Sequence, residues 1–178
     1  MKMRVIAGEL GGRFFAAPDS SLTHPMAERV RGALFNSLGD VSGMRVLDAF
    51  SGSGALAFEA ISRGAKSVIA IERDKRAQRL ITENIKSLGL KDRIKLIKAS
   101  CGVWNDTNQE QFDLVLLDPP YDDLQLSTVS KLIRHIKDNG LMVLSYPGRE
   151  SVPTVNGVVV VDDKSYGDAA LAYYRKAA

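Results

Sequence analysis

The sequence is poor in the residues and runs that mark several common protein classes. Its single cysteine, Cys101, excludes an internal disulfide and a multi-cysteine metal site. Its two histidines, His24 and His135, are far apart and give no metal-binding pattern, so we expect no metal. No apolar run approaches the roughly 18–20 residues that a membrane span needs. The first residues lack the apolar core of a signal peptide, and we expect a cytoplasmic protein with no membrane partner.

The chain has 178 residues, which suits one domain with a sizeable core. Its 45% hydrophobic and 25% charged residues exclude a largely disordered chain. The net charge of +3 is unevenly distributed: residues 60–98 carry eleven Lys or Arg and four acids, whereas residues 99–125 carry six acids and no Lys or Arg. A nucleic-acid surface beside a chemical site would fit this contrast, but on charge alone we favour solvated helix faces.

Strands and helices alternate along most of the chain. The predicted strands are 3–7, 12–17, 45–50, 67–72, 93–98, 112–117, 141–146, 155–161 and 169–175. The predicted helices are 27–38, 55–62, 75–88 and 124–137, and the stretches 99–111 and 162–167 are expected to be irregular.

Near-continuous apolar strands that alternate with helices are typical of a parallel sheet covered on both faces. We therefore predict an α/β fold with a seven-stranded, mostly parallel sheet and an antiparallel C-terminal hairpin. A hairpin and helix over residues 1–42 would form an N-terminal extension, and residues 43–178 would form the core.

A glycine-containing loop, Asp48-Ala-Phe-Ser-Gly-Ser-Gly54, joins a predicted strand to a predicted helix. Glycines let the backbone approach a ligand closely and leave amides to point at it. Glu72 ends the next strand, where a carboxylate can bind both hydroxyls of a ribose. The loop has two glycines, and acidic Asp48 suits a cationic sulfonium and amine better than a pyrophosphate. S-adenosylmethionine fits that description, although a Gly-x-Gly turn can also serve packing alone.

The strand predicted over 112–117 ends in Asp118-Pro119-Pro120-Tyr121. Prolines cannot donate hydrogen bonds and hold φ near about −65°, so a carbonyl beside Asp118 can be fixed toward a ligand. Two such acceptors would hold both N–H groups of an exocyclic amine, and Tyr121 would stack on the base. The chemistry would be direct in-line methyl transfer, catalysed by positioning and electrostatics. The structural alternative is a turn in which the prolines only end the strand.

These two motifs together resemble class I S-adenosylmethionine-dependent methyltransferases that act on amino groups of bases. More narrowly, the chain resembles the bacterial 16S rRNA guanine-N2 methyltransferase family of the RsmD type. The stretches that carry the narrower resemblance are 3–8, 12–13, 28–36, 47–56, 59–65 and 166–171. The resemblance implies a Rossmann-like fold, S-adenosylmethionine as cofactor and 16S rRNA as partner.

The resemblance also implies a role for individual residues. The residues expected to bind the cofactor are Asp48, Phe50, Ser51, Gly52, Gly54, Glu72, Ser100 and Cys101. The residues expected to hold the guanine are Asp118, Pro119, Pro120 and Tyr121. The candidate RNA contacts are Arg4, Arg13, Arg29 and Arg31, and the N-terminal hairpin and helix would also form part of a cofactor lid.

Two positions depart from the family pattern. His24-Pro25-Met26 stands where the family usually has Arg-Pro-Thr, and Ser100 stands where an acid or amide often contacts the adenine. A hydroxyl can still bond the adenine amine, more weakly than a charged partner.

Four further features are interpreted as follows. Cys101 is read as an inert loop residue and His135 as a surface residue, while Trp104 could either pack a loop or stack on adenine. The basic residues between 73 and 79 are weaker candidates for an RNA surface, because their helix flanks the cofactor side.

We therefore expect a monomeric enzyme that methylates the N2 amine of a guanine in 16S rRNA, within the small subunit or its assembly intermediate. A DNA adenine-N6 methyltransferase is the first alternative, although residues 1–42 leave little room for a duplex-reading region. A non-catalytic RNA-binding assembly factor is the second, and the intact loop and strand-end motifs argue against it. Protein amine methylation is the third, but such enzymes more often have Asn where Asp118 stands.

Overall fold

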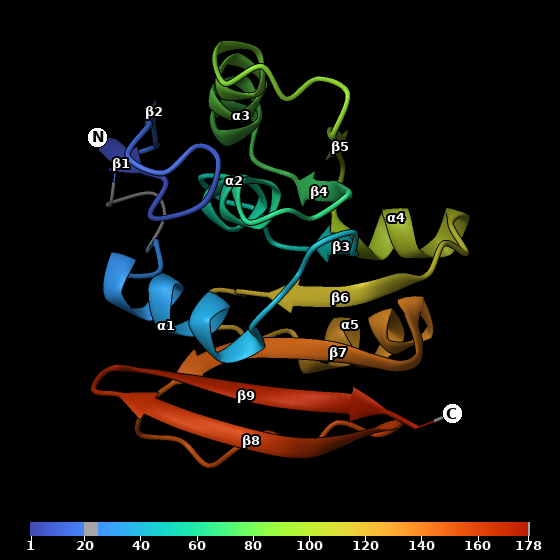
Figure 1. The fold of residues 1–178 in the computed structure, drawn as a ribbon. Coiled ribbons are helices and arrows are strands. Elements are labelled where there is room, and N and C mark those ends of the chain that lie inside the picture. The colour runs from blue at the N-terminus through green and yellow to red at the C-terminus, as the bar shows by residue number, and fades with distance from the viewer. Residues whose placement is uncertain (20–24, 178) are drawn as a thin grey trace.

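The computed structural model describes residues 1–19 and 25–177 and is built around a seven-stranded sheet (Figure 1). In spatial order its strands are β5 (Ile94–Lys98), β4 (Ser67–Glu72), β3 (Arg45–Asp48), β6 (Phe112–Leu117), β7 (Ile136–Pro147), β9 (Ala169–Lys176) and β8 (Val158–Tyr166). Strands β5 to β7 in this order pair in parallel, whereas β9 is antiparallel to both β7 and β8. The predicted α/β class, seven-stranded sheet and antiparallel C-terminal hairpin are confirmed.

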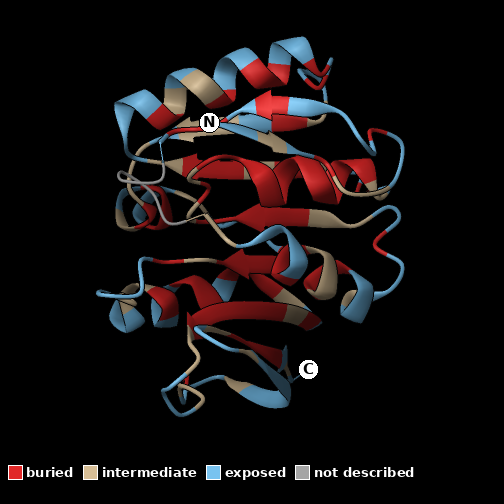
Figure 2. Cartoon of the chain, turned by 90° about the vertical axis from the view of Figure 1, so that its left-hand side faces the viewer, coloured by how far each residue is buried: buried red, intermediate tan, exposed pale blue. Residues whose placement is uncertain are grey.

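Helices cover both faces of the sheet and bury two apolar clusters (Figure 2). The first cluster includes residues of α1 (Glu28–Leu38), α2 (Ala55–Ser62) and α3 (Lys75–Ser87). The second includes residues of α4 (Cys101–Thr107) and α5 (Leu126–Leu132), which continues into a 3-10 turn at Ile133–His135. Strands β3 to β7 and β9 each contribute to both clusters, because successive side chains point to opposite faces. Within the described residues, every helix is too short or too polar to cross a lipid bilayer.

The structure corrects three of the predicted elements. The stretch 99–111, expected to be irregular, contains α4, which Ser100 caps by accepting a hydrogen bond from the Val103 amide at 3.2 Å. The helix predicted over 124–137 ends earlier, because Ile136 already pairs with Phe112 of β6. The stretch 162–167, expected to be irregular, is mostly strand: β8 is exposed, so polar residues there face solvent without ending it.

His135 and Trp104 form a buried contact, which corrects the expectation that His135 lies on the surface. The imidazole is fully buried, with Nδ1 2.7 Å from the Glu110 carbonyl and Nε2 2.9 Å from Asn105 Oδ1. The Trp104 ring lies 4.4 Å from it, centroid to centroid, and also faces Phe112. Trp104 therefore packs inside the protein, where it cannot stack on a ligand.

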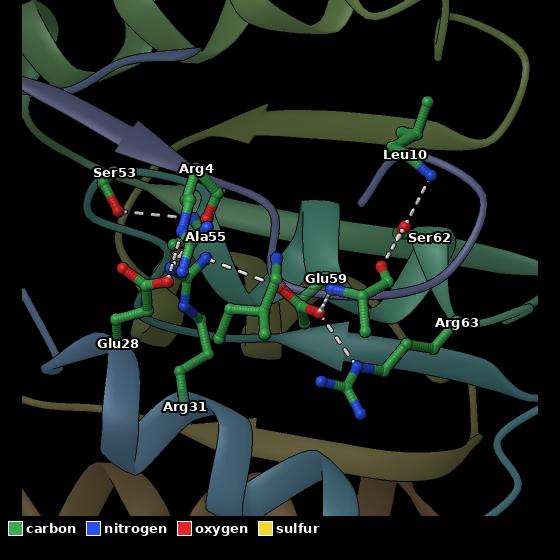
Figure 3. Close-up of polar contacts among 11 residues, drawn as sticks. Arg4, Leu10, Glu28, Arg31, Ser53, Ala55, Glu59, Ser62 and Arg63 are labelled. Atoms are coloured by element: carbon green, nitrogen blue, oxygen red, sulfur yellow. Dashed lines mark hydrogen bonds and ion pairs between the residues drawn. The ribbon is translucent and has the colours of Figure 1, made fainter. Parts of the chain in front are cut away.

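The N-terminal strands β1 (Lys2–Arg4) and β2 (Phe14–Ala16) form the expected antiparallel hairpin, separate from the main sheet. The segment between them is held by the buried carboxylate of Glu59 on α2 (Figure 3). The Glu59 oxygens accept hydrogen bonds from the backbone amides of Ile6 at 2.9 Å and Ala7 at 3.1 Å. The hairpin is thus fixed to a helix that begins at the predicted cofactor loop.

Two arginines balance the charge of Glu59. Arg63 Nε donates to the carboxylate at 2.8 Å, and Arg31 Nη1 lies 3.6 Å from it (Figure 3). Arg31 is only 1% exposed, and its Nη2 donates to the backbone carbonyl of Arg4. The expectation that Arg31 contacts RNA is therefore wrong: its guanidinium is enclosed beneath the hairpin.

Ser62, one turn beyond Glu59, completes the attachment. Its hydroxyl accepts from the Leu10 amide at 2.8 Å and donates to the Ala7 carbonyl at 2.6 Å. Gly8 adopts φ +82°, and a Cβ placed on it would lie 2.0 Å from the Ser62 carbonyl oxygen. Close approach of the two backbones therefore requires glycine at position 8.

We expect Glu59→Ala to lower the free energy of unfolding by about 3–5 kcal/mol, because it leaves Arg31 buried without its counter-charge. Chemical denaturation measures this change. Glu83→Ala, which removes an exposed carboxylate from α3, serves as the control and should change stability by less than about 0.5 kcal/mol. Equal effects of the two substitutions would show that the Glu59 contacts do not stabilise the fold.

Candidate active site

Three acidic side chains meet at the carboxyl ends of β3, β4 and β6. Asp48, the last residue of β3, pairs in register with Ala70 of β4 and with Leu116 of β6. Glu72 and Asp118 therefore lie two residues beyond that level on the two flanking strands. The chain changes direction across the sheet at β3, which is where open α/β sheets bind their ligands.

Asp48 is a fully buried carboxylate, and neither of its oxygens has a hydrogen-bond partner among the described residues. Burial raises the pKa of Asp48 to about 7; the nearby Ser51 hydroxyl opposes this rise, and the charges of Asp118 and Glu72 add to it. A buried acceptor of this kind is costly unless something donates to it or brings positive charge. The position therefore favours a cationic ligand.

The loop after Asp48 is bent by two glycines and closes toward β4. Gly52 and Gly54 adopt φ +53° and +83°, and a Cβ on Gly54 would lie 2.9 Å from the Phe58 ring. The Ser51 amide donates to the Ile71 carbonyl at 3.0 Å. The backbone conformation of the loop thus favours glycine at both positions, and the Phe58 ring leaves no room for a Cβ at position 54.

Glu72 is joined directly to this loop. Its carboxylate accepts from the Gly52 amide at 2.7 Å and from the Asp74 amide at 2.8 Å. Burial raises the pKa of Glu72 above its usual value, and these backbone hydrogen bonds oppose the rise. The carboxylate is thus held in a fixed position and retains further lone pairs for a ligand.

A cavity of about 260 Å³ opens beside Glu72. It is lined by four of the predicted cofactor residues, namely Phe50, Glu72, Ser100 and Cys101. Gln125 and Thr128, at the start of α5, also line it and were not predicted. Gln125 adopts φ +51°, a backbone feature for which the sequence carries no glycine as a signal.

Cys101 and Ser100 support the cavity wall. The Cys101 thiol is buried and donates to the Ala49 carbonyl at 2.6 Å. Burial raises the pKa of Cys101 to about 12, so the group stays a thiol near neutral pH and is no nucleophile. The Ser100 hydroxyl accepts the α4 capping bond and keeps its proton available for a ligand acceptor.

The strand-end motif lies on β6, the neighbour of β3. Pro119 is buried, Pro120 is exposed, and Tyr121 is 38% exposed. The Tyr121 hydroxyl lies 2.6 Å from the hydroxyl of buried Ser145 on β7. Burial raises the pKa of Asp118 to about 7, and its contact with Ser145 opposes the rise. An acceptor carboxylate and an accessible aromatic ring thus follow one another in the chain.

The remaining candidate RNA contacts are exposed but differ in their partners. Arg4 forms an ion pair with Glu28 at the start of α1. Arg13 donates to the Ser87 carbonyl at 3.2 Å, and Arg29 lies 5.9 Å from the Tyr166 ring centroid. Of the departures from the family pattern, His24 lies outside the described residues.

The residues at this edge fit a ligand that combines a cation, a diol and an aromatic base. Asp48 would balance the positive charge, Glu72 would accept from the diol, and the walls of the cavity would enclose the base. Among the described residues no group of three His, Cys, Asp or Glu is arranged to hold a metal ion. The arrangement therefore points to binding and positioning of an organic ligand.

Comparisons with known proteins identify the family of the chain. The family model described as Conserved hypothetical protein 95 matches residues 3–175. The Bacillus subtilis protein YlbH is 32% identical over 98% of this chain and 99% of its own length. The Haemophilus influenzae protein named "Ribosomal RNA small subunit methyltransferase D" is 30% identical over 98% of this chain and 94% of its own. The solved structure of Escherichia coli yhhF superposes with a TM-score of 0.89 at 27% identity and covers 100% of this chain and 99% of its own.

The raised pKa of Asp48 predicts an effect on stability that needs no ligand. Because the folded pKa of about 7 exceeds the ordinary value of 3.8, the stabilising contribution of the protonated group is lost as pH rises from about 4 through 7. The isosteric Asp48→Asn carries no charge at any pH. The melting temperature of Asp48→Asn minus that of the native protein should therefore increase from pH 4 to pH 8. A constant difference across that range, measured by thermal unfolding, would contradict the assigned cause.

Proposed function

The chain belongs to the Conserved hypothetical protein 95 family, and we propose that it methylates the N2 amine of a guanine in small-subunit ribosomal RNA, using S-adenosylmethionine. One observation carries the proposal: Asp118 and Tyr121 follow the strand next to Asp48, beside a cavity that Glu72 lines. The acceptor for an amine and the site for a cationic nucleoside cofactor are thus adjacent. The name of the Haemophilus relative, a small-subunit rRNA methyltransferase, supports the choice of RNA.

S-adenosylmethionine supplies a methyl carbon made electrophilic by its sulfonium, and S-adenosylhomocysteine is the product. We assign Asp48, Phe50, Ser51, Gly52 and Gly54 to its methionine half. Glu72 would hold the ribose, and Ser100 and Cys101 would line the adenine site. Ionised Asp48 has an opposite charge for the ligand and no competing partner among the described residues.

Asp118 and the carbonyl of Pro119 would accept the two N–H groups of the guanine amine, with Tyr121 stacked on the ring. Holding both protons turns the nitrogen lone pair out of conjugation and toward the methyl carbon. The nitrogen forms the new N–C bond, and the electron pair of the broken C–S bond stays with sulfur. Asp118 or water then takes the proton that the nitrogen loses.

A guanine that is paired or stacked must be exposed before it can react. Extrusion costs a few kcal/mol, and stacking on Tyr121 would return about 1–3 kcal/mol. A folded RNA loop that already presents an unstacked base lowers the cost further. We therefore propose that the small subunit, or its assembly intermediate, is the substrate of a monomeric enzyme.

We assign residues 1–42 to RNA contact and to part of the cofactor lid, with residues 43–178 as the methyltransferase core. Arg4, Arg13 and Arg29 are the candidate phosphate contacts. Of these, Arg29 lies at the first turn of α1, next to Tyr166 at the turn between β8 and β9. That turn lies at the carboxyl edge of the sheet, because Ala169 pairs with Pro147 at the end of β7.

Asp118→Ala should lower kcat by at least about 100-fold, because it removes the acceptor that aims the amine. S-adenosylhomocysteine affinity, measured by calorimetry, should stay within about threefold of native. Transfer of labelled methyl to small-subunit RNA measures the rate. Native activity in a variant that still binds the cofactor would show that the chemistry is wrongly assigned.

Arg29→Ala should raise the KM for RNA and reduce the salt dependence of binding by about one phosphate contact, with kcat unchanged. Lys131→Ala, at an exposed position on α5, is the control and should change neither. Steady-state assays at several salt concentrations compare the two. Identical KM values would remove Arg29 from the RNA surface.

Nucleoside mass spectrometry of rRNA, from cells with and without the gene, tests the base and the substrate together. The loss of one N2-methylguanosine from 16S rRNA is the expected result. Unchanged rRNA, together with methylation of duplex DNA by the purified protein, would overturn the proposal. In parallel, assays on naked 16S rRNA and on the small subunit determine which form is modified.

A further inference from the structure

We propose that Ser145 is a positioning residue for methyl transfer: its buried hydroxyl fixes the Tyr121 ring and the Asp118 carboxylate relative to each other. This inference rests on the proposed function, since it concerns how the same two groups present a base amine. Neither the strand-end motif nor the cofactor loop contains Ser145, which comes from a different strand.

The register of the sheet places Ser145 beside the motif. Leu117 of β6 pairs with Leu144 of β7, so the next residues on the two strands, Asp118 and Ser145, lie side by side where β6 ends. Ser145 is 1% exposed and stands in a strand segment that is otherwise apolar, Leu141–Tyr146. A buried hydroxyl is retained at low cost only where it forms hydrogen bonds.

One hydrogen-bond contact joins Ser145 to the motif: its Oγ lies 2.6 Å from the Tyr121 hydroxyl. Its other neighbour in the motif is Asp118, which the sheet register sets beside it and whose raised pKa the serine hydroxyl lowers. We assign the Ser145 proton to the ionised Asp118 carboxylate, which only accepts hydrogen bonds, and the Tyr121 proton to Ser145. The result is one directed chain from the stacking ring through the serine to the carboxylate.

This chain affects both groups. The tether fixes the plane of a ring that is otherwise accessible to solvent, so less freedom is lost when a base stacks on it. The donated hydrogen bond favours the ionised form of Asp118, which is the form that can accept a hydrogen bond from the amine. The ionisable groups on which the charge of Asp118 acts are Asp48 and Tyr121, and neither is cationic.

Two single variants separate these effects. Tyr121→Phe keeps the ring and removes only the tether, whereas Ser145→Ala removes the tether and the bond to Asp118. We expect each to lower kcat, Tyr121→Phe by about threefold and Ser145→Ala by about tenfold, with KM for RNA within about twofold of native. The double variant should be no slower than Ser145→Ala alone, because both changes break the same chain.

A second readout needs no catalysis. In the ligand-free protein, a carboxyl-carbon NMR titration should give Asp118 a higher pKa in Ser145→Ala than in the native protein, and the native value in Tyr121→Phe. The acid limb of the kcat–pH profile should move to higher pH in the same variant only. Ser130→Ala, which removes an exposed hydroxyl from α5, is the matched control and should change none of these values.

Native kcat and an unchanged Asp118 titration in Ser145→Ala would overturn the inference, as would strictly additive losses in the double variant. S-adenosylhomocysteine affinity and thermal unfolding identify a variant that has not folded; in that case Tyr121→Phe carries the test of the tether alone. The proposed function fails separately: Asp118→Ala would then retain activity. Inactive Asp118→Ala with a native-like Ser145→Ala would reject only the role of Ser145.

Discussion

The burial of like charges at one sheet edge is the constraint on which the site depends. Parallel pairing places Asp48 between β4, which ends in Glu72, and β6, which Asp118 follows, and little of these three carboxyl groups reaches water. Such a group resists ionisation until a cation or a hydrogen-bond donor arrives, which is why the pKa values of Asp48 and Asp118 both rise to about 7. When these buried groups ionise, they lower the stability of the ligand-free protein. This cost favours a role for the edge in binding a ligand. A cationic cofactor and an amine that donates two hydrogen bonds would satisfy these groups in turn.

A second buried carboxylate, that of Glu59, differs from these three because its hydrogen-bond donors and its counter-charges lie within the protein. Two backbone amides and two guanidinium groups surround it, and the hairpin of β1 and β2 is held in place through it (Figure 3). Helix α2 carries Glu59 on a buried turn and begins directly after Gly54. The same helix therefore connects the loop that would hold the cofactor to the segment that we assign to the RNA. Helix α2 therefore fixes the position of the N-terminal hairpin relative to the loop from Asp48 to Gly54.

The residues that could be predicted are those whose position follows from local pattern. The loop from Asp48 to Gly54, the carboxylate of Glu72 and the motif at Asp118 each lie at the end of an apolar strand, and parallel strands end at a common edge. Their meeting could therefore be predicted from order along the chain alone.

The residues that could not be predicted depend on partners distant in the sequence. The sequence makes Arg31 a candidate RNA contact, but in the fold its side chain is buried beside Glu59. His135 is buried for the same kind of reason, by Asn105 and Trp104. Ser145 did carry a signal, as a hydroxyl in an apolar strand. That hydroxyl can be linked to the site only once the register of β6 and β7 shows that Ser145 lies beside Asp118.

The contrast between basic and acidic stretches of the sequence is reduced by folding. In the acidic stretch, Glu110 pairs with Arg45, Asp113 pairs with Lys137, and Asp118 is turned into the site. In the basic stretch, Arg63 is bound to Glu59, and Arg93 donates to Glu9 and to two backbone carbonyls.

Neither stretch therefore presents its full charge as one face. Arg29, next to Tyr166, and Arg73, which lines the cavity, are both exposed, so the RNA that we propose as substrate would have cations to contact. Because Asp48 is buried and these arginines are exposed, a cationic cofactor and a polyanionic RNA would bind at neighbouring positions without competing for the same charge.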